Sequence, residues 1–257
     1  MRLLTLARDL QRRKGRERRS LFVAEGVRAV EEVVRSGVRI RGAISSPELE
    51  ETSRGRALLD DLGNRTDELL RVEAAELADA AGTESPQGVI VIAEIPERSL
   101  NDVTAGPDAR LLVLDGVQDP GNVGTIIRTA AGLGAIAVVA LPGTVDLWNA
   151  KVVRGAMGAH LRMAAVQCGS EDLLTWAERE RVELWVADAA GEPLHLARPP
   201  ARLGIVLGNE GAGVSEPVRA RATRAIGLPL AAGIESLNVA VAAGIMLYAL
   251  GAQRGLV

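Results

Sequence analysis

The chain has 257 residues, of which 47% are hydrophobic and 25% charged, and its formal net charge is −3. This composition is typical of a soluble globular protein, and the negative net charge argues against a protein that coats nucleic acid by bulk attraction. The single cysteine, Cys168, excludes an intrachain disulfide and a thiolate metal cluster. The longest apolar segment, residues 239–252, falls short of the roughly 20 residues that span a bilayer. Because a signal-peptide core is also lacking, we expect a cytoplasmic protein without membrane contact.

Metal binding is equally unsupported by the sequence. The two histidines, His160 and His195, lie far apart, and neither belongs to a ligand spacing such as His-Glu-x-x-His. We therefore expect no metal site.

A basic segment lies near the start of the chain. Between Arg8 and Arg19 seven basic residues accompany only two acidic ones, Asp9 and Glu17. Such a segment could bind phosphates. A solvated helix surface explains the same charges equally well, so charge alone does not decide between the two.

Residues 1–96 predict a small α/β unit. Apolar residues recur at helical spacing from Val27 to Val34, and Gly37 ends that helix. The other elements expected here are a strand at 38–45, short helices at 58–62 and 74–80, and a strand at 88–95. Residues 97–109 are polar and contain a Gly-Pro pair, which indicates a linker.

Residues 110–257 predict a larger α/β domain in which strands and helices alternate. The expected strands are 110–115, 135–141, 162–167, 182–188, 203–208 and 225–230, and the expected helices are 122–132, 148–158, 170–180 and a closing helix from Leu237. Near-continuous apolar strands that alternate with helices indicate a parallel sheet covered on both faces.

Three loops at strand ends carry unusual residues: 115–128, 207–215 and 228–240. In an open parallel sheet, ligands bind beyond the carboxyl ends of the strands. The glycines of the first loop are not followed by the lysine of a phosphate-binding loop, and no loop contains Gly-x-Gly-x-x-Gly. The sequence therefore argues against a Rossmann-type nucleotide enzyme.

Each polar residue of these loops also has a simple structural explanation. Asn122 and Ser236 could cap the helices that follow them, and Arg128 could form a surface ion pair with a nearby aspartate. Glu210, between glycines, could be an exposed turn residue. Taken one at a time, these explanations are the more common ones.

Taken together, the loops resemble a known family. They resemble the three motifs of the SpoU (TrmH-type) RNA 2′-O-ribose methyltransferases of the SPOUT class. The matching segments are Asp-Pro-Gly-Asn-x-Gly-x-x-x-Arg at 119–128, Leu-Gly-x-Glu-Gly-x-Gly at 207–213 and Glu-Ser-Leu-Asn-Val-Ala at 235–240. Two N-terminal segments are similar to parts of the substrate-binding domain of members that act on ribosomal RNA. They are Phe22-Val-Ala-Glu-Gly-Val-Arg28 and Ser85-Pro-Gln-Gly-Val89.

The resemblance implies both an architecture and partners. Residues 1–96 would be an RNA substrate-binding domain, 97–109 a linker, and 110–257 a methyltransferase domain with a deep trefoil knot. The protein would bind S-adenosylmethionine and form a homodimer whose two chains build each site. A 23S-type ribosomal RNA is the favoured substrate, because members that act on transfer RNA usually lack the first domain.

The resemblance also assigns roles to residues. Cofactor contacts fall on Gly208, Leu228 and Leu237, and the catalytic set comprises Asn122, Arg128, Glu210, Ser236 and Asn238. An arginine pKa above about 12 leaves almost no neutral form near pH 7, so Arg128 is a poor general base. Our hypothesis is that it orients the 2′-hydroxyl and clamps the neighbouring phosphate.

Three other functions stay open at this point: methylation of transfer RNA, RNA binding by a knotted protein without turnover, and a nucleotide-dependent enzyme of Rossmann type. The complete motifs argue against a pure binding protein, which has no need for both Arg128 and Glu210.

Overall fold

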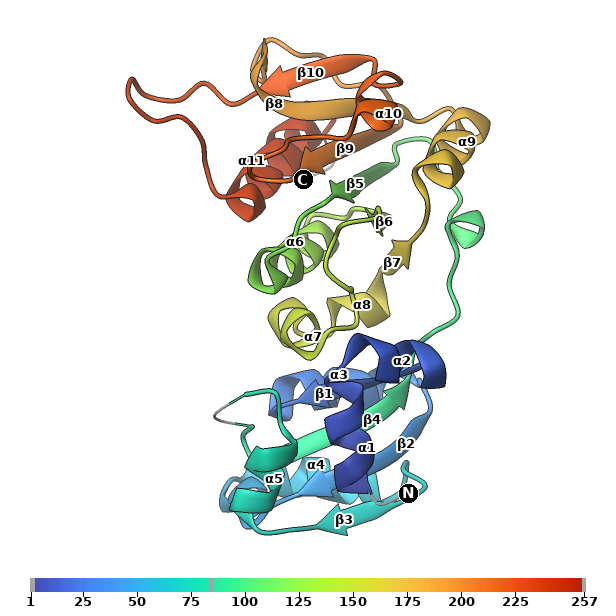
Figure 1. The fold of residues 1–257 in the computed structure, drawn as a ribbon, viewed down its shortest axis with the longest axis vertical. Helices are drawn as coiled ribbons and strands as arrows, with labels where there is room; N and C mark the ends of the chain where they lie inside the picture. Colours follow the sequence, from blue (N-terminus) through green and yellow to red (C-terminus); the bar gives the residue numbers. More distant parts are fainter. Residues whose placement is uncertain (1–2, 84–85, 256–257) are drawn as a thin grey trace. The chain divides into compact units, whose positions relative to one another are not determined.

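The computed structural model describes residues 3–83 and 86–255, and contacts divide the chain into two compact units (Figure 1). The N-terminal unit contains residues 1–97 and 148–162, and the C-terminal unit contains residues 98–147 and 163–257. The predicted boundaries place residues 148–162 in the second domain. They group instead with the N-terminal residues, where the Trp148 ring lies 4.7 Å from the Phe22 ring, centroid to centroid.

A four-stranded sheet forms the centre of the N-terminal unit, in the order β1-β4-β2-β3. Strand β4 is antiparallel to β1 and β2, and β3 is parallel to β2. The strands are β1 (Leu21–Glu25), β2 (Ile40–Ser45), β3 (Leu69–Arg71) and β4 (Val89–Glu94). The helices are α1 (Leu3–Leu10), α2 (Arg13–Arg19), α3 (Val27–Ser36), η1 (Pro47–Glu51), α4 (Ser53–Gly63), α5 (Ala74–Ala80), α7 (Ala150–Ala156) and α8 (Ala159–Arg162).

The basic N-terminal segment is folded as helices α1 and α2. Helix α1 buries Leu3, Ala7 and Leu10 in the core of the unit. Arg16 is buried as well, and its guanidinium donates to the carbonyl oxygen of Leu10 at 2.7 Å. Hydrogen bonds from Arg19 hold the pKa of Asp9 below its usual value, and Arg18 adds to the effect. Part of this charge therefore stabilises the local fold.

The C-terminal unit is built on a six-stranded sheet in the order β10-β8-β9-β5-β6-β7, in which neighbouring strands run parallel. The strands are β5 (Arg110–Asp115), β6 (Ala137–Ala140), β7 (Ala164–Gln167), β8 (Glu183–Pro193), β9 (Leu203–Gly208) and β10 (Arg224–Gly227). The helices are η2 (Leu100–Asp102), α6 (Pro120–Gly132), α9 (Ser170–Glu180), α10 (Glu216–Arg219) and α11 (Val239–Ala252). The predicted parallel α/β sheet is confirmed.

Buried side chains hold this sheet to its helices. Trp176 of α9 is 1% exposed, and its indole N–H donates to the carbonyl oxygen of Val103 at 2.9 Å. Central strand β5 is buried along its whole length, as its apolar sequence predicts. Burial also raises the pKa of the Cys168 thiol to about 11, so the thiol stays protonated near neutral pH.

Several element boundaries differ from the predicted ones for identifiable reasons. The expected helix at 148–158 breaks into α7 and α8, because Met157 and Gly158 both adopt positive φ angles, 49° and 83°. The closing helix begins at Val239 rather than Leu237, because Asn238 caps it. The last strand ends at Gly227, and the four-residue helix α10 was not expected from the sequence. Ser85 lies outside the described residues.

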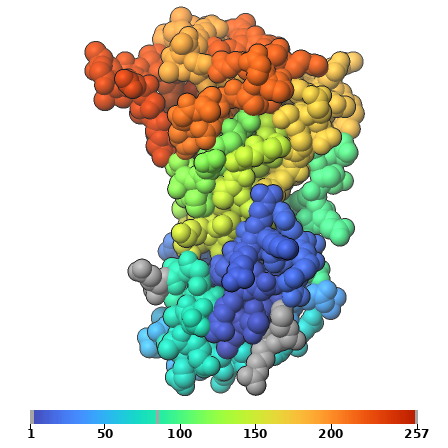
Figure 2. All heavy atoms as spheres, viewed as in Figure 1, coloured from blue at the N-terminus to red at the C-terminus, as the bar shows by residue number. Residues whose placement is uncertain are grey.

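The segment between β10 and α11 leaves the sheet as a long loop (Figure 1) and stands out from the surface in the space-filling view (Figure 2). Ile234 and Leu237 in this segment are 55% and 38% exposed. Within the described residues no helix has the length and apolar character needed to cross a membrane.

Candidate active site

A cavity of about 460 Å³ lies within the C-terminal unit, where strand β9 ends. Two of the three loops singled out in the sequence line it, and the first loop reaches its rim through Asn122. The predicted residues among its lining are Gly208, Glu210, Leu228, Ser236 and Leu237. The loops thus meet at the carboxyl end of a parallel sheet, where such folds bind ligands.

Side-chain hydrogen bonds join the three loops in one chain. The amide nitrogen of Asn238 donates to Asn122 Oδ1 at 2.8 Å. The amide nitrogen of Asn122 donates in turn to Glu210 Oε1 at 3.1 Å. These residues are 116 and 88 positions apart in the sequence. The fold therefore gathers three of the five predicted catalytic residues into direct contact.

The helix caps show which of these side chains are needed for local structure. Asp119, and not Asn122, caps α6, because Asp119 Oδ1 accepts the backbone N–H of Asn122 at 2.7 Å. Asn238, and not Ser236, caps α11 by accepting the N–H of Ala240 at 2.9 Å. Capping therefore does not explain Asn122 or Ser236.

We expect Asp119→Ala to lower the free energy of unfolding by about 1 kcal/mol, because the first turn of α6 loses its cap. Asn122→Ala should cost less, since its two side-chain hydrogen bonds are open to water. Urea denaturation followed by circular dichroism compares the two variants. A larger loss for Asn122→Ala would mean that the cap is wrongly assigned.

The Glu210 loop is held by residues outside the predicted catalytic and cofactor-binding sets. Asn209 donates to the carbonyl oxygen of Gly116 at 2.9 Å, and its own Oδ1 accepts the N–H groups of Gly211 and Ala212. Asp115 accepts the N–H of Ser215 at 2.7 Å. An asparagine beside glycines is a turn signal that could have identified the first of these contacts.

Close backbone packing at Gly208 leaves no room for a side chain. A Cβ built there would lie 2.3 Å from the carbonyl carbon of Gly213, closer than real side chains allow. Gly213 itself has a φ of 73°. The end of β9 can therefore pack against the turn at Gly213 only without a side chain.

Arg128 stands apart from this arrangement. It is exposed on α6, does not line the cavity, and forms no hydrogen bond or ion pair with the described residues. Six residues correspond to a rotation of about 240° around a helix, so Arg128 and Asn122 face different directions. The predicted surface pair with Asp115 or Asp119 is absent from the described part of the chain, where both aspartates accept backbone N–H groups instead.

The charges of the cavity are mainly acidic. Asp188, Glu210 and Glu235 line it together with one arginine, Arg219, which pairs with Asp188 at 2.9 Å. The backbone N–H of Ala190 and the Arg219 guanidinium hold the pKa of Asp188 below its usual value. The cavity therefore suits a ligand that carries positive charge and also presents apolar surface to residues such as Leu228 and Met246.

A parallel sheet with a cavity and converging polar residues at its carboxyl edge defines a ligand-binding α/β enzyme domain. The comparisons with known families then identify which one. Residues 109–248 match the SpoU rRNA Methylase family, and residues 5–91 match the MRM3-like substrate binding domain. The chain belongs to the SpoU rRNA methylase family, and the resemblance seen in its motifs is confirmed.

Individual relatives share nearly the full length of the chain. It is 33% identical over 242 residues to the 23S rRNA (guanosine(2553)-2′-O)-methyltransferase RlmP of Bacillus subtilis (strain 168), covering 94% of this chain and 92% of that protein. The SpoU methyltransferase AviRb of Streptomyces viridochromogenes, solved with AdoMet, is similar with a TM-score of 0.90 and 27% identity, covering 99% and 98%. An AdoMet-bound rRNA methyltransferase from Sinorhizobium meliloti gives 0.86 and 27%, covering 97% and 94%.

Proposed function

We propose that this protein transfers a methyl group from S-adenosylmethionine to a ribose 2′-hydroxyl of RNA, with 23S-type ribosomal RNA as its substrate. The observation that carries the proposal is the hydrogen-bonded chain from Asn238 through Asn122 to Glu210 at the cavity. A relative of similar length that is named for 23S rRNA supports the substrate. Transfer RNA is the alternative substrate.

The cavity fits the cofactor in its charge and its apolar lining. S-adenosylmethionine supplies an electrophilic methyl group on a positively charged sulfonium. Gly208, Leu228 and Leu237 line the cavity and would contact the cofactor there. The excess of carboxylates suits the sulfonium charge. No group of three or more possible metal ligands occurs among the described residues.

In the proposed reaction the ribose O2′ attacks the methyl carbon in line, the bond from sulfur to that carbon breaks, and the hydroxyl proton leaves. Asn122 holds Glu210 by one oxygen, Oε1, while Oε2 accepts no hydrogen bond from the described residues. That second oxygen is placed to orient or receive a proton. Ser236 and Asn238 complete the polar rim. Fixing the geometry of the reactants supplies much of the rate.

We assign Arg128 to the site of a partner chain. In a single chain it does not line the cavity, and its guanidinium has no hydrogen-bond or ion-pair partner among the described residues. Helix α11, which packs against α6, exposes an apolar stripe: Val241, Ile245 and Tyr248 are 51%, 42% and 56% exposed. A stripe at this spacing is the kind of surface that a symmetric homodimer buries. In such a dimer Arg128 orients the 2′-hydroxyl and clamps the adjacent phosphate.

The remaining assignments follow from the same proposal. Residues 1–96 act as an RNA substrate-binding domain, 97–109 as a linker, and 110–257 as the catalytic domain, with a trefoil knot in its C-terminal segments. The return of the chain from β10 to α11 along the cavity supports that path. The site of action would be the cytoplasm.

Calorimetric titration tests the cofactor assignment. We expect saturable binding of S-adenosylmethionine, one molecule per chain, that an excess of NAD does not displace. Binding of NAD in place of S-adenosylmethionine would instead support a nucleotide-dependent enzyme of Rossmann type.

A further inference from the structure

A second cavity, of about 660 Å³, lies within the N-terminal unit. It brings together the two N-terminal segments that the sequence singled out. The backbone N–H of Val27 donates to Gln87 Oε1 at 3.3 Å across 60 positions of sequence, and both residues line the cavity. The proposed methylation chemistry uses neither segment.

Three arginines line this cavity: Arg28, Arg54 and Arg154. The acidic residues in its lining are Glu25 and Glu48. The Glu25 side chain is 1% exposed and already accepts the backbone N–H of Gly82 at 2.7 Å, besides its ion pair with Arg154 at 3.4 Å. Its charge is therefore engaged inside the protein, whereas Glu48 is exposed, so the three arginines outnumber the one exposed carboxylate of the lining.

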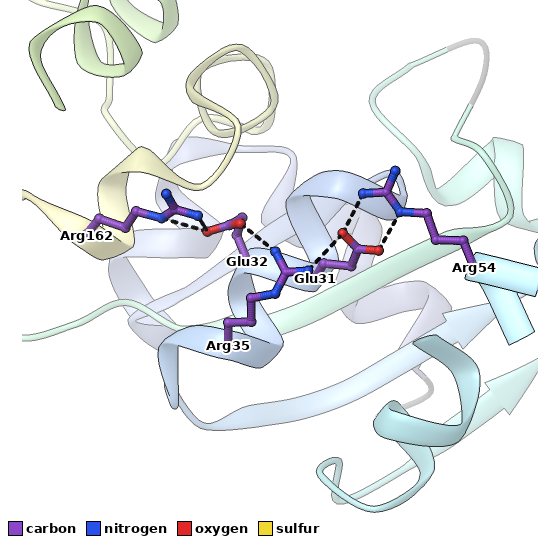
Figure 3. Close-up of polar contacts among 5 residues, drawn as sticks. All are labelled: Glu31, Glu32, Arg35, Arg54 and Arg162. Atoms are coloured by element: carbon purple, nitrogen blue, oxygen red, sulfur yellow. Dashed lines mark hydrogen bonds and ion pairs between the residues drawn. The ribbon is translucent and has the colours of Figure 1, made fainter. Parts of the chain in front are cut away.

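The neighbouring glutamates are also paired, as Figure 3 shows. Glu31 accepts two hydrogen bonds of 2.6 Å from Arg54 and lies 3.5 Å from Arg35. Glu32 binds Arg35 at 2.8 Å and also pairs with Arg162. These pairs fix the positions of the arginines, but they leave little negative charge to balance another cation.

Arg28 is that further cation. It is exposed and forms no hydrogen bond or ion pair with the described residues, although its charge contributes, after Arg54 and Arg35, to lowering the pKa of Glu31. It lies in the first turn of α3, and that first turn contains no acidic residue. The amino end of a helix disfavours a positive side chain and favours a bound anion. An anion held by Arg28 and a second arginine would remove this unfavourable arrangement.

The rest of the lining suits an organic group attached to that anion. Leu49 and Ala29 are 2% and 5% exposed and form apolar wall, and Met157 adds a polarisable thioether. The amide nitrogen of Gln87 donates no hydrogen bond to the described residues, so it can donate to a ligand. A cationic rim, an apolar wall and a free amide donor together match a nucleotide. Unpaired RNA presents such groups, because its bases can turn out and pack on side chains.

We propose that this cavity binds one unpaired nucleotide of the RNA substrate, with its phosphodiester on Arg28 and Arg154 and its base against Leu49 and Met157. The inference rests on the proposed function for the identity of the RNA. It gives the N-terminal unit a defined contact with a nucleotide other than the one that is methylated. That contact would help to select the RNA segment.

Arg28→Gln tests this subsite. Arg198→Gln is the matched control, because Arg198 is also exposed and also forms no hydrogen bond or ion pair with the described residues. The probe is a transcript of large-subunit ribosomal RNA that carries no modification, titrated at several salt concentrations. We expect Arg28→Gln to weaken RNA binding about tenfold and to reduce the salt dependence by about one phosphate contact, while the control changes neither. Arg28→Glu should weaken binding further.

Wild-type RNA affinity and salt dependence in both Arg28 variants would overturn the proposal. So would micromolar binding of inorganic phosphate or uridine 5′-monophosphate that the transcript does not displace, because the cavity would then serve a free phosphate compound. Cofactor affinity should be unchanged in every variant, which also shows that they are folded. If the wild-type protein bound the transcript through Arg28 but methylated no RNA, the proposed function would fail and this subsite would stand.

Discussion

Replacing Arg128 with lysine is expected to reduce methyl transfer by about 100-fold or more while leaving the affinity for S-adenosylmethionine within about twofold. Lysine keeps the positive charge but loses the planar fork of donors that can hold a hydroxyl and a phosphate together. A misplacement of about 1 Å at the reacting atoms costs roughly this factor. Arg128 does not line the cavity, so cofactor binding has no reason to change. Single-turnover methylation and calorimetry measure the two quantities.

Arg198→Lys is the control for this substitution, because Arg198 is an exposed arginine outside the proposed machinery. Normal turnover in Arg128→Lys would refute the orienting role. Loss of cofactor affinity together with turnover would place Arg128 in the cofactor site instead.

The second large effect is expected at Glu210. Glu210→Gln keeps an oxygen that can accept the Asn122 hydrogen bond, but it removes the negative charge. If Glu210 orients or receives the departing proton, turnover should fall by about 10²–10⁴-fold, the usual contribution of such a group. The rate of transfer at saturating cofactor and RNA is the measurement. A variant that methylates normally would remove Glu210 from the mechanism.

Mixing these two inactive variants tests whether two chains build each site. If Arg128 serves the cavity of its partner, a dimer of one Arg128→Lys chain and one Glu210→Gln chain contains one intact site and one doubly altered site. Random exchange of subunits then restores about a quarter of the wild-type activity. No recovery, with exchange confirmed by mass spectrometry, would mean that Arg128 and Glu210 act from the same chain or that no dimer forms.

Much of the fold can be predicted from local sequence patterns. The apolar strand at 110–115 and the alternation of strands and helices after it predict the parallel sheet, because buried parallel strands must be apolar on both faces. The pairing of residues 148–162 with the N-terminal unit was not predictable, since it depends on a long-range contact between Trp148 and Phe22. The break at Met157 was missed because a methionine with positive φ has no sequence signature.

The candidate site could be predicted only from its three motifs taken together. Individually, Asn122 and Ser236 could have been helix caps, and only the structure shows that Asp119 and Asn238 have that role. The direct contact between Asn122 and Glu210 required folding, because 88 positions separate them. Only the structure shows that Arg128 lies outside the cavity lining, because a spacing of six helical residues gives no more than the angle between its side chain and that of Asn122.

Transfer of labelled methyl from S-adenosylmethionine to unmodified total RNA, followed by mapping of the product, tests the central claim most directly. We expect a single 2′-O-methylated nucleotide in large-subunit ribosomal RNA, recognised by its resistance to alkaline cleavage, and loss of the label with Arg128→Ala. A methyl group on a base, or no transfer by a protein that still binds the cofactor and this RNA, would contradict the account.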